Sequence, residues 1–253
     1  MAAAYDSYDY PSYWQGREYE HASEVIALKS FLAKIPKINN LIDIGAGYGR
    51  LTPTYLVRSK KITLIDPSAR LLQVARRNFK KNKKIRYIHS KAESMEGKVR
   101  NKSSDVVIMI RVLHHIEDID RIFKTVNRIL QNNGHFILEF ANKSHFKSSL
   151  KEVLKGNIMF PLDIFPKDIR SKKSIRLKCL PFINYHPGII KHKLEDFGFS
   201  IVEVRSVSNI RYPFLKRILP QDFILSIEKT VQTLLSKFDF GPSIFVLAKK
   251  ITL

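Results

Sequence analysis

Cysteine and acidic side chains are scarce in this chain of 253 residues. Its one cysteine, Cys179, excludes an intrachain disulfide framework and a metal site built from several cysteines, so we expect no metal. We interpret Cys179 as a small apolar filler. Long apolar runs are also missing, and the N-terminal sequence MAAAYDSYDY lacks a basic segment followed by an apolar one. We therefore expect a cytoplasmic protein without a signal peptide or an integral membrane segment.

The charge is strongly unbalanced, because 44 Lys and Arg face 23 Asp and Glu, a formal net charge of +21. Such a field attracts nucleic acid, an anionic membrane surface or an acidic substrate. A lysine-rich set of solvated faces explains it equally well. Charge alone concerns association and leaves the fold open.

From Leu41 onward, short apolar segments alternate with helical ones after a first amphipathic helix predicted over 18–35. Strands that are apolar on both faces and alternate with helices predict a parallel sheet covered on both sides, an α/β fold. We predict strands at 41–44, 62–65, 85–89, 105–110, 134–140, 199–207 and 243–250, and helices near 49–58, 68–80, 119–131 and 187–197.

Two stretches depart from this alternation. Residues 142–180 hold ten Lys or Arg against three acidic residues, which predicts an inserted basic cap. Residues 208–240 form a second insertion, in which apolar residues at a/d-like spacing predict a helix that packs on the core: Ile224, Ile227, Val231, Leu234 and Phe238.

The sequence LIDIGAGYGR, residues 41–50, joins a predicted strand to a predicted helix through three glycines. A dinucleotide site needs G-x-G-x-x-G, and here Arg50 stands at the third glycine position, while no Gly-Lys-Ser/Thr follows for a phosphate loop. Asp43 would repel a pyrophosphate and suits an ammonium or sulfonium group. Asp66 ends the next strand, where an acid accepts hydrogen bonds from ribose hydroxyls.

In this arrangement the chain resembles the class I S-adenosylmethionine-dependent methyltransferases, in the branch often labelled type 11. LIDIGAGYGR and LIDPS resemble the first two motifs of the family, VIMIRVLHHIED resembles the segment after the fourth strand, and RILQNNGHFILEF the passage into the fifth. The resemblance implies a Rossmann-like seven-stranded sheet whose last strand, 243–250, is antiparallel, with helices on both faces and a cap formed by the insertions.

The resemblance also implies S-adenosylmethionine as the cofactor and a division of the chain. We expect a lid and helix in residues 1–38, a cofactor-binding core in 39–141, the cap in 142–180 and completion of the core in 181–253. Asp43 and the loop backbone would hold the methionine end, Asp66 the ribose, and a leader with Arg17 the cofactor carboxylate. The full set of expected cofactor-binding residues is Tyr13, Arg17, Asp43, Gly45, Ala46, Gly47, Tyr48, Gly49, Asp66, Pro67, Ala92, Glu93 and Arg111.

One position departs from the family pattern. In SKAES, Lys91 stands where the family has an acid that accepts from the adenine amino group, and lysine offers no acceptor. Glu93 or a backbone carbonyl then substitutes, or apolar contact holds the adenine. The departure also keeps open a non-catalytic binding protein that retains the nucleotide fold.

Three histidines are candidate catalytic bases, since histidine is the usual base near neutral pH. His114 and His115 follow the fourth predicted strand, and His186 precedes a predicted helix, where ordering the loop is the alternative role.

Two classes of nucleic-acid methyl acceptor are disfavoured because the motifs they require are missing. The segment IRVLHH lacks the Asn/Asp-Pro-Pro-aromatic motif of enzymes that methylate exocyclic amines of bases, and Cys179 lacks the Pro-Cys context of cytosine-C5 enzymes. We expect a small or lipid-like, anionic acceptor, with RNA as the alternative, and a monomer or homodimer.

Overall fold

The computed structural model describes residues 10–177 and 179–251, so residues 1–9 of the expected lid and Lys178 of the cap lie outside the described residues. Within this part of the chain, seven strands form one sheet in the order β3-β2-β1-β4-β5-β9-β8. The strands of this sheet are β1 (Ile38–Ile44), β2 (Ser59–Asp66), β3 (Ile85–His89), β4 (Ser104–Met109), β5 (Leu130–Ala141), β8 (Phe199–Val207) and β9 (Ser243–Lys250). The α/β class predicted from the sequence is confirmed.

The last strand is inserted antiparallel, as predicted. β9 pairs antiparallel with β5, where Leu138 lies opposite Val246, and antiparallel with β8, where Val204 lies opposite Val246. β1 to β5 pair in parallel, so the carboxyl ends of β1, β2 and β4 meet at one edge of the sheet. That edge is where an open α/β sheet binds its ligand.

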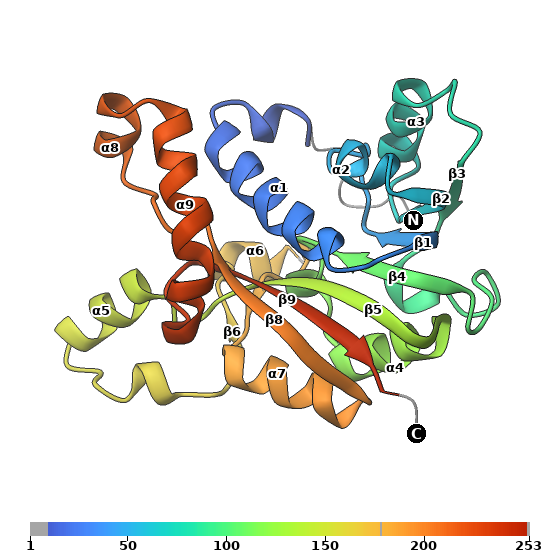
Figure 1. Cartoon of the computed structure of the whole chain (residues 1–253). Coiled ribbons are helices and arrows are strands. Elements are labelled where there is room, and N and C mark those ends of the chain that lie inside the picture. Colours follow the sequence, from blue (N-terminus) through green and yellow to red (C-terminus); the bar gives the residue numbers. More distant parts are fainter. Residues whose placement is uncertain (1–9, 178, 252–253) are drawn as a thin grey trace.

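Helices cover both faces of the sheet (Figure 1). One face carries α1 (Glu18–Ala33), α2 (Thr52–Leu56) and α3 (Ala69–Asn78), and its core includes Phe31, Tyr55 and Leu72. The other face carries α4 (Ile119–Ile129) and α7 (Pro187–Asp196), with Phe123 and Leu194 in its core. Both faces of the central strands are therefore apolar, the pattern from which the parallel sheet was predicted.

Helix boundaries follow their capping residues. Ser68 accepts a hydrogen bond from the amide of Leu71 at the start of α3, and Asp118 accepts one from Arg121 at the start of α4. The helix predicted near 49–58 is shorter than expected, because residues 45–51 form the glycine loop and α2 begins only at Thr52.

The two insertions follow β5 and β8, and their longer helices lie at the left of Figure 1. The first holds short elements: α5 (Phe146–Leu154), the 3-10 turn η5 (Phe160–Leu162), β6 (Lys167–Asp168) and α6 (Lys172–Arg176). β7 (Ile183–Asn184) follows this insertion and pairs antiparallel with β6. The second holds α8 (Pro213–Ile218), α9 (Gln221–Leu235) and the 3-10 turn η6 (Ser236–Phe238).

The predicted buried face of α9 is wrong. Ile224 is buried, but Leu234 and Phe238 are 55% and 74% exposed, and the buried side instead carries Glu228 and Gln232. Glu228 is tolerated there because its carboxylate accepts hydrogen bonds from the Tyr19 hydroxyl and from the amides of residues 208 and 209. Hydrogen bonds to Glu228, and not the spacing of apolar residues, account for which face of α9 is buried.

The structure also bears on Cys179 and on membrane-spanning helices. Cys179 is exposed, so its interpretation as an apolar filler is wrong. Among the described residues, no helix is both long enough and apolar enough to cross a membrane.

Candidate active site

The glycine loop at the end of β1 has a backbone that other residues fit poorly. Gly45, Gly47 and Gly49 have φ values of +75°, +56° and +82°. A Cβ on Gly45 would lie 2.1 Å from Cγ2 of Val112, and a Cβ on Gly49 would lie 2.6 Å from Cε2 of Phe79. Gly45 thus allows close contact between the loop and the segment after β4.

Asp43 lies at the carboxyl end of β1, 5% exposed, and accepts a 2.5 Å hydrogen bond from the Tyr55 hydroxyl. Burial raises the pKa of Asp43 to about 7, and the charge of Asp66 adds to this, while the hydrogen bond from Tyr55 opposes it. Because burial disfavours the ionised form of this carboxyl, a neighbouring cation would stabilise that form strongly.

Asp66 ends β2 beside the glycine loop. Its carboxylate accepts hydrogen bonds of 2.8 Å from the amides of Gly47 and Ser68. These two backbone donors fix the orientation of the carboxylate and tie the second strand to the loop. The two aspartates and the three glycines therefore form one local unit, as their spacing predicted.

The N-terminal segment covers this unit. The 3-10 turn η2 (Ser12–Trp14) follows Tyr10, whose ring packs against Tyr48 of the loop at 6.2 Å and stacks on Tyr13 at 5.8 Å. Burial raises the pKa of Tyr10 to about 12. Arg17 is exposed and lies 4.2 Å over the Tyr13 ring, so it joins this segment through an aromatic contact.

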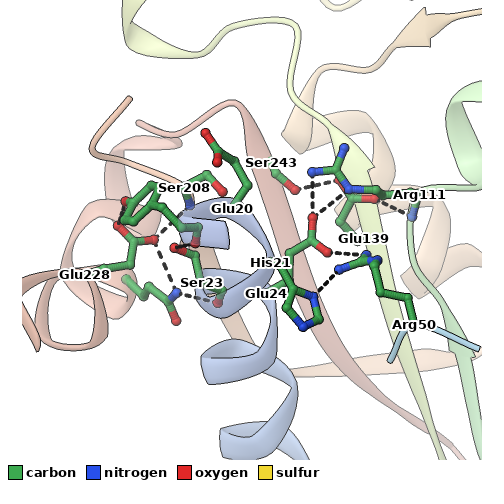
Figure 2. A network of polar contacts seen from close by, with 12 residues as sticks. Glu20, His21, Ser23, Glu24, Arg50, Arg111, Glu139, Ser208, Glu228 and Ser243 are labelled. Atoms are coloured by element: carbon green, nitrogen blue, oxygen red, sulfur yellow. Dashed lines mark hydrogen bonds and ion pairs between the residues drawn. The ribbon is translucent and has the colours of Figure 1, made fainter. Parts of the chain in front are cut away.

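A buried charge network lies beneath the N-terminal segment (Figure 2). The Glu24 carboxylate is fully buried between two guanidinium groups, 2.5 Å from Arg50 and 2.6 Å from Arg111. Trp14 packs over both, with ring centroids 3.5 Å from the Arg50 carbon Cζ and 4.8 Å from that of Arg111. Burial opposes the charged form of Glu24, yet the two arginines hold the pKa of its carboxyl below its usual range.

The same network reaches the middle of the sheet. Arg111 lies two residues after the end of β4 in a left-handed conformation, φ +60°, and its amide donates to the buried carboxylate of Glu139 on β5 at 2.7 Å. Ser243 on β9 donates to the other oxygen of Glu139 at 2.5 Å. Three strands and α1 are thereby held together next to the glycine loop.

His114 and His115 lie in the 3-10 turn η4 (Leu113–His115), directly after Val112, which touches the glycine loop. Their ring centroids are 4.0 Å apart, and Phe182 packs 4.4 Å from His114. Burial lowers the pKa of both rings, that of His114 well below its usual value. Both histidines are therefore neutral at pH 7.

The two rings differ in their hydrogen bonds. Nδ1 of His115 lies 2.7 Å from the carbonyl oxygen of Pro181, which only accepts, so Nδ1 carries the proton and Nε2 is the basic nitrogen. Nδ1 of His114 is buried without a hydrogen-bond partner in the described part of the chain.

His186 lies at the start of α7. Its Nδ1 accepts from the amide of Gly188 at 3.1 Å, and its Nε2 lies 3.2 Å from the carbonyl oxygen of Pro161. With Nδ1 accepting, the proton is on Nε2, and both nitrogens are engaged. This geometry matches the loop-ordering role considered from the sequence.

The residues expected near the adenine follow β2 and β3. Ala92 is buried and Glu93 half-buried in the 3-10 turn η3 (Ala92–Ser94), while Lys91 is exposed. The carbonyl of Pro67 lies 2.8 Å from Nε2 of His89.

Apart from Arg111, the buried charge network beside the glycine loop was not predicted from the sequence. Trp14, Glu24, Arg50 and Glu139 carried no recognisable spacing, because they come from four separate elements. Arg50 was noted only as the residue that replaces a glycine.

The arrangement fits a cationic nucleoside. The carboxylates of Asp43 and Asp66 flank the glycine loop, where added Cβ atoms would collide with neighbouring side chains. Their negative charge repels a phosphate and attracts a sulfonium or ammonium group. In the described residues no group of His, Cys, Asp and Glu is arranged to hold a metal ion.

Comparisons with known proteins agree with this geometry. Residues 42–138 match the family model described as a methyltransferase domain. The chain is 32% identical over 105 residues to a ubiquinone biosynthesis O-methyltransferase of Pelagibacter ubique, covering 41% of this chain and 42% of that protein. It is 30% identical over 138 residues to a ribosomal protein L11 methyltransferase of Staphylococcus saprophyticus, covering 51% and 44%.

The matches thus span less than half the length of these two curated relatives. A putative S-adenosylmethionine-dependent methyltransferase from Listeria monocytogenes has the same fold, with a TM-score of 0.64 at 18% identity over 92% of this chain and 99% of that one. Together with the glycine loop and its two aspartates, these matches place the methyltransferase domain of this chain in the class I S-adenosylmethionine-dependent methyltransferases.

Proposed function

We propose that this chain transfers the methyl group of S-adenosylmethionine to an amphipathic, lipid-like acceptor that enters under the basic cap. The methyl-transfer part of this proposal rests on the positions of Asp43 and Asp66 beside the glycine loop, whose glycines have left-handed backbone conformations. The domain match at residues 42–138 supports it.

In this proposal, Asp43 and the backbone from Gly45 to Gly49 hold the methionine end, and Asp66 accepts from the ribose. The N-terminal segment around Tyr13 and Arg17 covers the cofactor. When bound, S-adenosylmethionine supplies an electrophilic methyl group whose bond to sulfur breaks as a bond to the acceptor forms, the acceptor losing a proton where it carries one.

His115 is our candidate for the group that takes this proton. Its Nδ1–H is oriented by the Pro181 carbonyl, so Nε2 is the nitrogen without a proton, and burial lowers the pKa of the ring so that the neutral form dominates at pH 7. His114 positions it through ring contact, and His186 orders the cap.

The surface of the insertions supports a lipid-like acceptor. Large apolar side chains are exposed on it, including Leu154 at 78%, Phe165 at 74% and Phe214 at 70%. Basic side chains alternate with them along α5 and α6, which suits an acceptor with an apolar body and a negative group. Pro181 and Phe182, which directly follow the cap, contact the two histidines, which connects this surface to the site.

Two measurements test the proposal. In calorimetry, S-adenosylmethionine binds the wild type and the Asp222→Ala control, which alters an exposed residue of α9, while Asp66→Ala binds it far more weakly. In an extract incubated with methyl-labelled cofactor, label enters the lipid fraction.

The outcomes separate the two parts of the proposal. Label in RNA or protein would contradict the lipid-like acceptor and leave methyl transfer standing. Absence of cofactor binding, or undiminished binding by Asp66→Ala, would contradict the cofactor site itself.

A further inference from the structure

The connection between β3 and β4 leaves part of the sheet uncovered. Residues 90–103 contain only the 3-10 turn η3, whereas the connections after β1, β2 and β4 contain α2, α3 and α4. A cleft of about 400 Å³ lies there, lined by residues 40–42 of β1, 61–63 of β2, 83–86 and 88 at β3, and 98–100 and 103 before β4. Neither Asp43 nor Asp66 lines this cleft. Because side chains alternate along a strand, both aspartates lie on the opposite face of the sheet from Ile42 and Thr63, so the cleft is separate from the candidate active site.

All the charged residues that line the cleft are basic. No acidic residue lines it, and none of its basic side chains forms an ion pair with an acidic residue in the described part of the chain. Positive charges gathered in a concave site without counter-charges attract a polyanion. The basic residues are Lys61, Lys83, Lys84, Arg86, Lys98 and Arg100.

The sheet register explains this grouping. Thr63 lies between Ile42 on β1 and Arg86 on β3, and Lys61 lies beside Asn40. Because side chains alternate across a strand, residues 61 and 63 share the face that carries Ile42. The face thus offers a hydroxyl and cationic groups beside aliphatic side chains.

The aliphatic part of the cleft is formed by half-buried Val99 above Ile42 and Ile88, which are 4% and 9% exposed and belong to one core cluster. Guanidinium and ammonium groups bind phosphate oxygens, and an aliphatic surface accepts the face of a flat ring. Its volume lies in the range of sites that hold a small organic ligand.

We propose that this cleft binds a phosphorylated nucleoside, with the phosphates on the basic side chains and the base against the aliphatic surface. A free nucleotide and a nucleotide within an RNA strand share this chemistry. The proposal stands independently of methyl transfer.

The test uses calorimetry on the full chain in 50 mM KCl with S-adenosylhomocysteine in excess, so that adenine binding at the candidate active site is blocked. The probes are ATP, tripolyphosphate, adenosine and a 12-nucleotide oligo(U). We expect ATP or the oligonucleotide to bind more tightly than tripolyphosphate, and adenosine not to bind. Affinity should fall as salt rises, because phosphate binding releases counterions.

Two double variants of equal charge change localise the site. Lys61→Glu/Arg86→Glu should weaken binding roughly tenfold or more by placing like charges beside the phosphates. Lys60→Glu/Lys124→Glu alters two exposed lysines that do not line the cleft, and its affinity should stay within about twofold of the wild type. Lys61→Gln/Arg86→Gln should give an intermediate loss, and thermal unfolding confirms that each variant is folded.

Tighter binding of ATP identifies a free nucleotide, and tighter binding of oligo(U) identifies an RNA strand. Equal losses in the two Glu double variants would overturn the proposal, since they would show attraction by net charge alone. Tripolyphosphate binding as tightly as ATP would overturn the contact with the base, and failure of ATP and oligo(U) alike would overturn the site.

Discussion

Binding of the cofactor should depend on pH through Asp43. Burial raises the pKa of this carboxyl to about 7, and a cation held beside it favours the ionised form. At pH 6 the protonated carboxyl must lose its proton before it can stabilise a sulfonium or ammonium group. Affinity for S-adenosylmethionine should therefore rise between pH 6 and pH 8.

The size of the effect follows from this pKa. With a value of about 7, the carboxyl is ionised to about 9% at pH 6 and about 91% at pH 8. If only the ionised form binds, affinity rises about tenfold over this interval, equivalent to about 1.4 kcal/mol.

Calorimetry at several pH values measures this dependence, and Asp43→Asn is the matched control. The variant retains the titration of the ligand and lacks the carboxylate, so the difference between the two curves isolates Asp43. Proton uptake or release, read from buffers of different ionisation enthalpy, should show release on binding at pH 6.5. Parallel curves for wild type and variant, or proton uptake, would refute the reasoning.

Three further substitutions have expected outcomes. Glu24→Gln should lower the free energy of unfolding in urea by about 3 kcal/mol, because it leaves two partly buried arginines without their carboxylate. The control Glu96→Gln, at an exposed ion pair, should lower it by less than about 1 kcal/mol. Equal losses in the two variants would contradict the role of the network. Gly45→Ala should cost about 1–3 kcal/mol more than Gly97→Ala in the same assay, since both have positive φ but only the former meets Val112. His115→Gln should lower kcat roughly 100-fold or more without changing cofactor affinity, as measured with the labelled acceptor fraction; an unchanged kcat would exclude it as the base.

The positions of the strands along the chain and of the glycine loop were predictable because they depend on local sequence. Apolar runs of four to eight residues, such as 62–65 and 105–110, bury both faces of a strand and leave little alternative. The loop was predictable because Gly45, Gly47 and Gly49 take conformations that other residues rarely adopt.

The rotation of α9 was not predictable in the same way. Its apolar residues suggested one buried face, yet Glu228 is buried because Tyr19 and the residues after β8 supply its donors. A helix pattern records apolar spacing and carries no information on which distant donors satisfy a carboxylate.

The sequence by itself determined the α/β alternation, the cofactor loop and the two aspartates, since each rests on neighbouring residues and backbone sterics. Only the tertiary structure decided that Glu24, Arg50, Arg111 and Glu139 share one buried network. It also decided that the bare connection between β3 and β4 leaves a basic cleft on one face of the sheet. Both depend on packing between elements far apart in the chain, where burial strengthens charge interactions that spacing along the sequence does not encode.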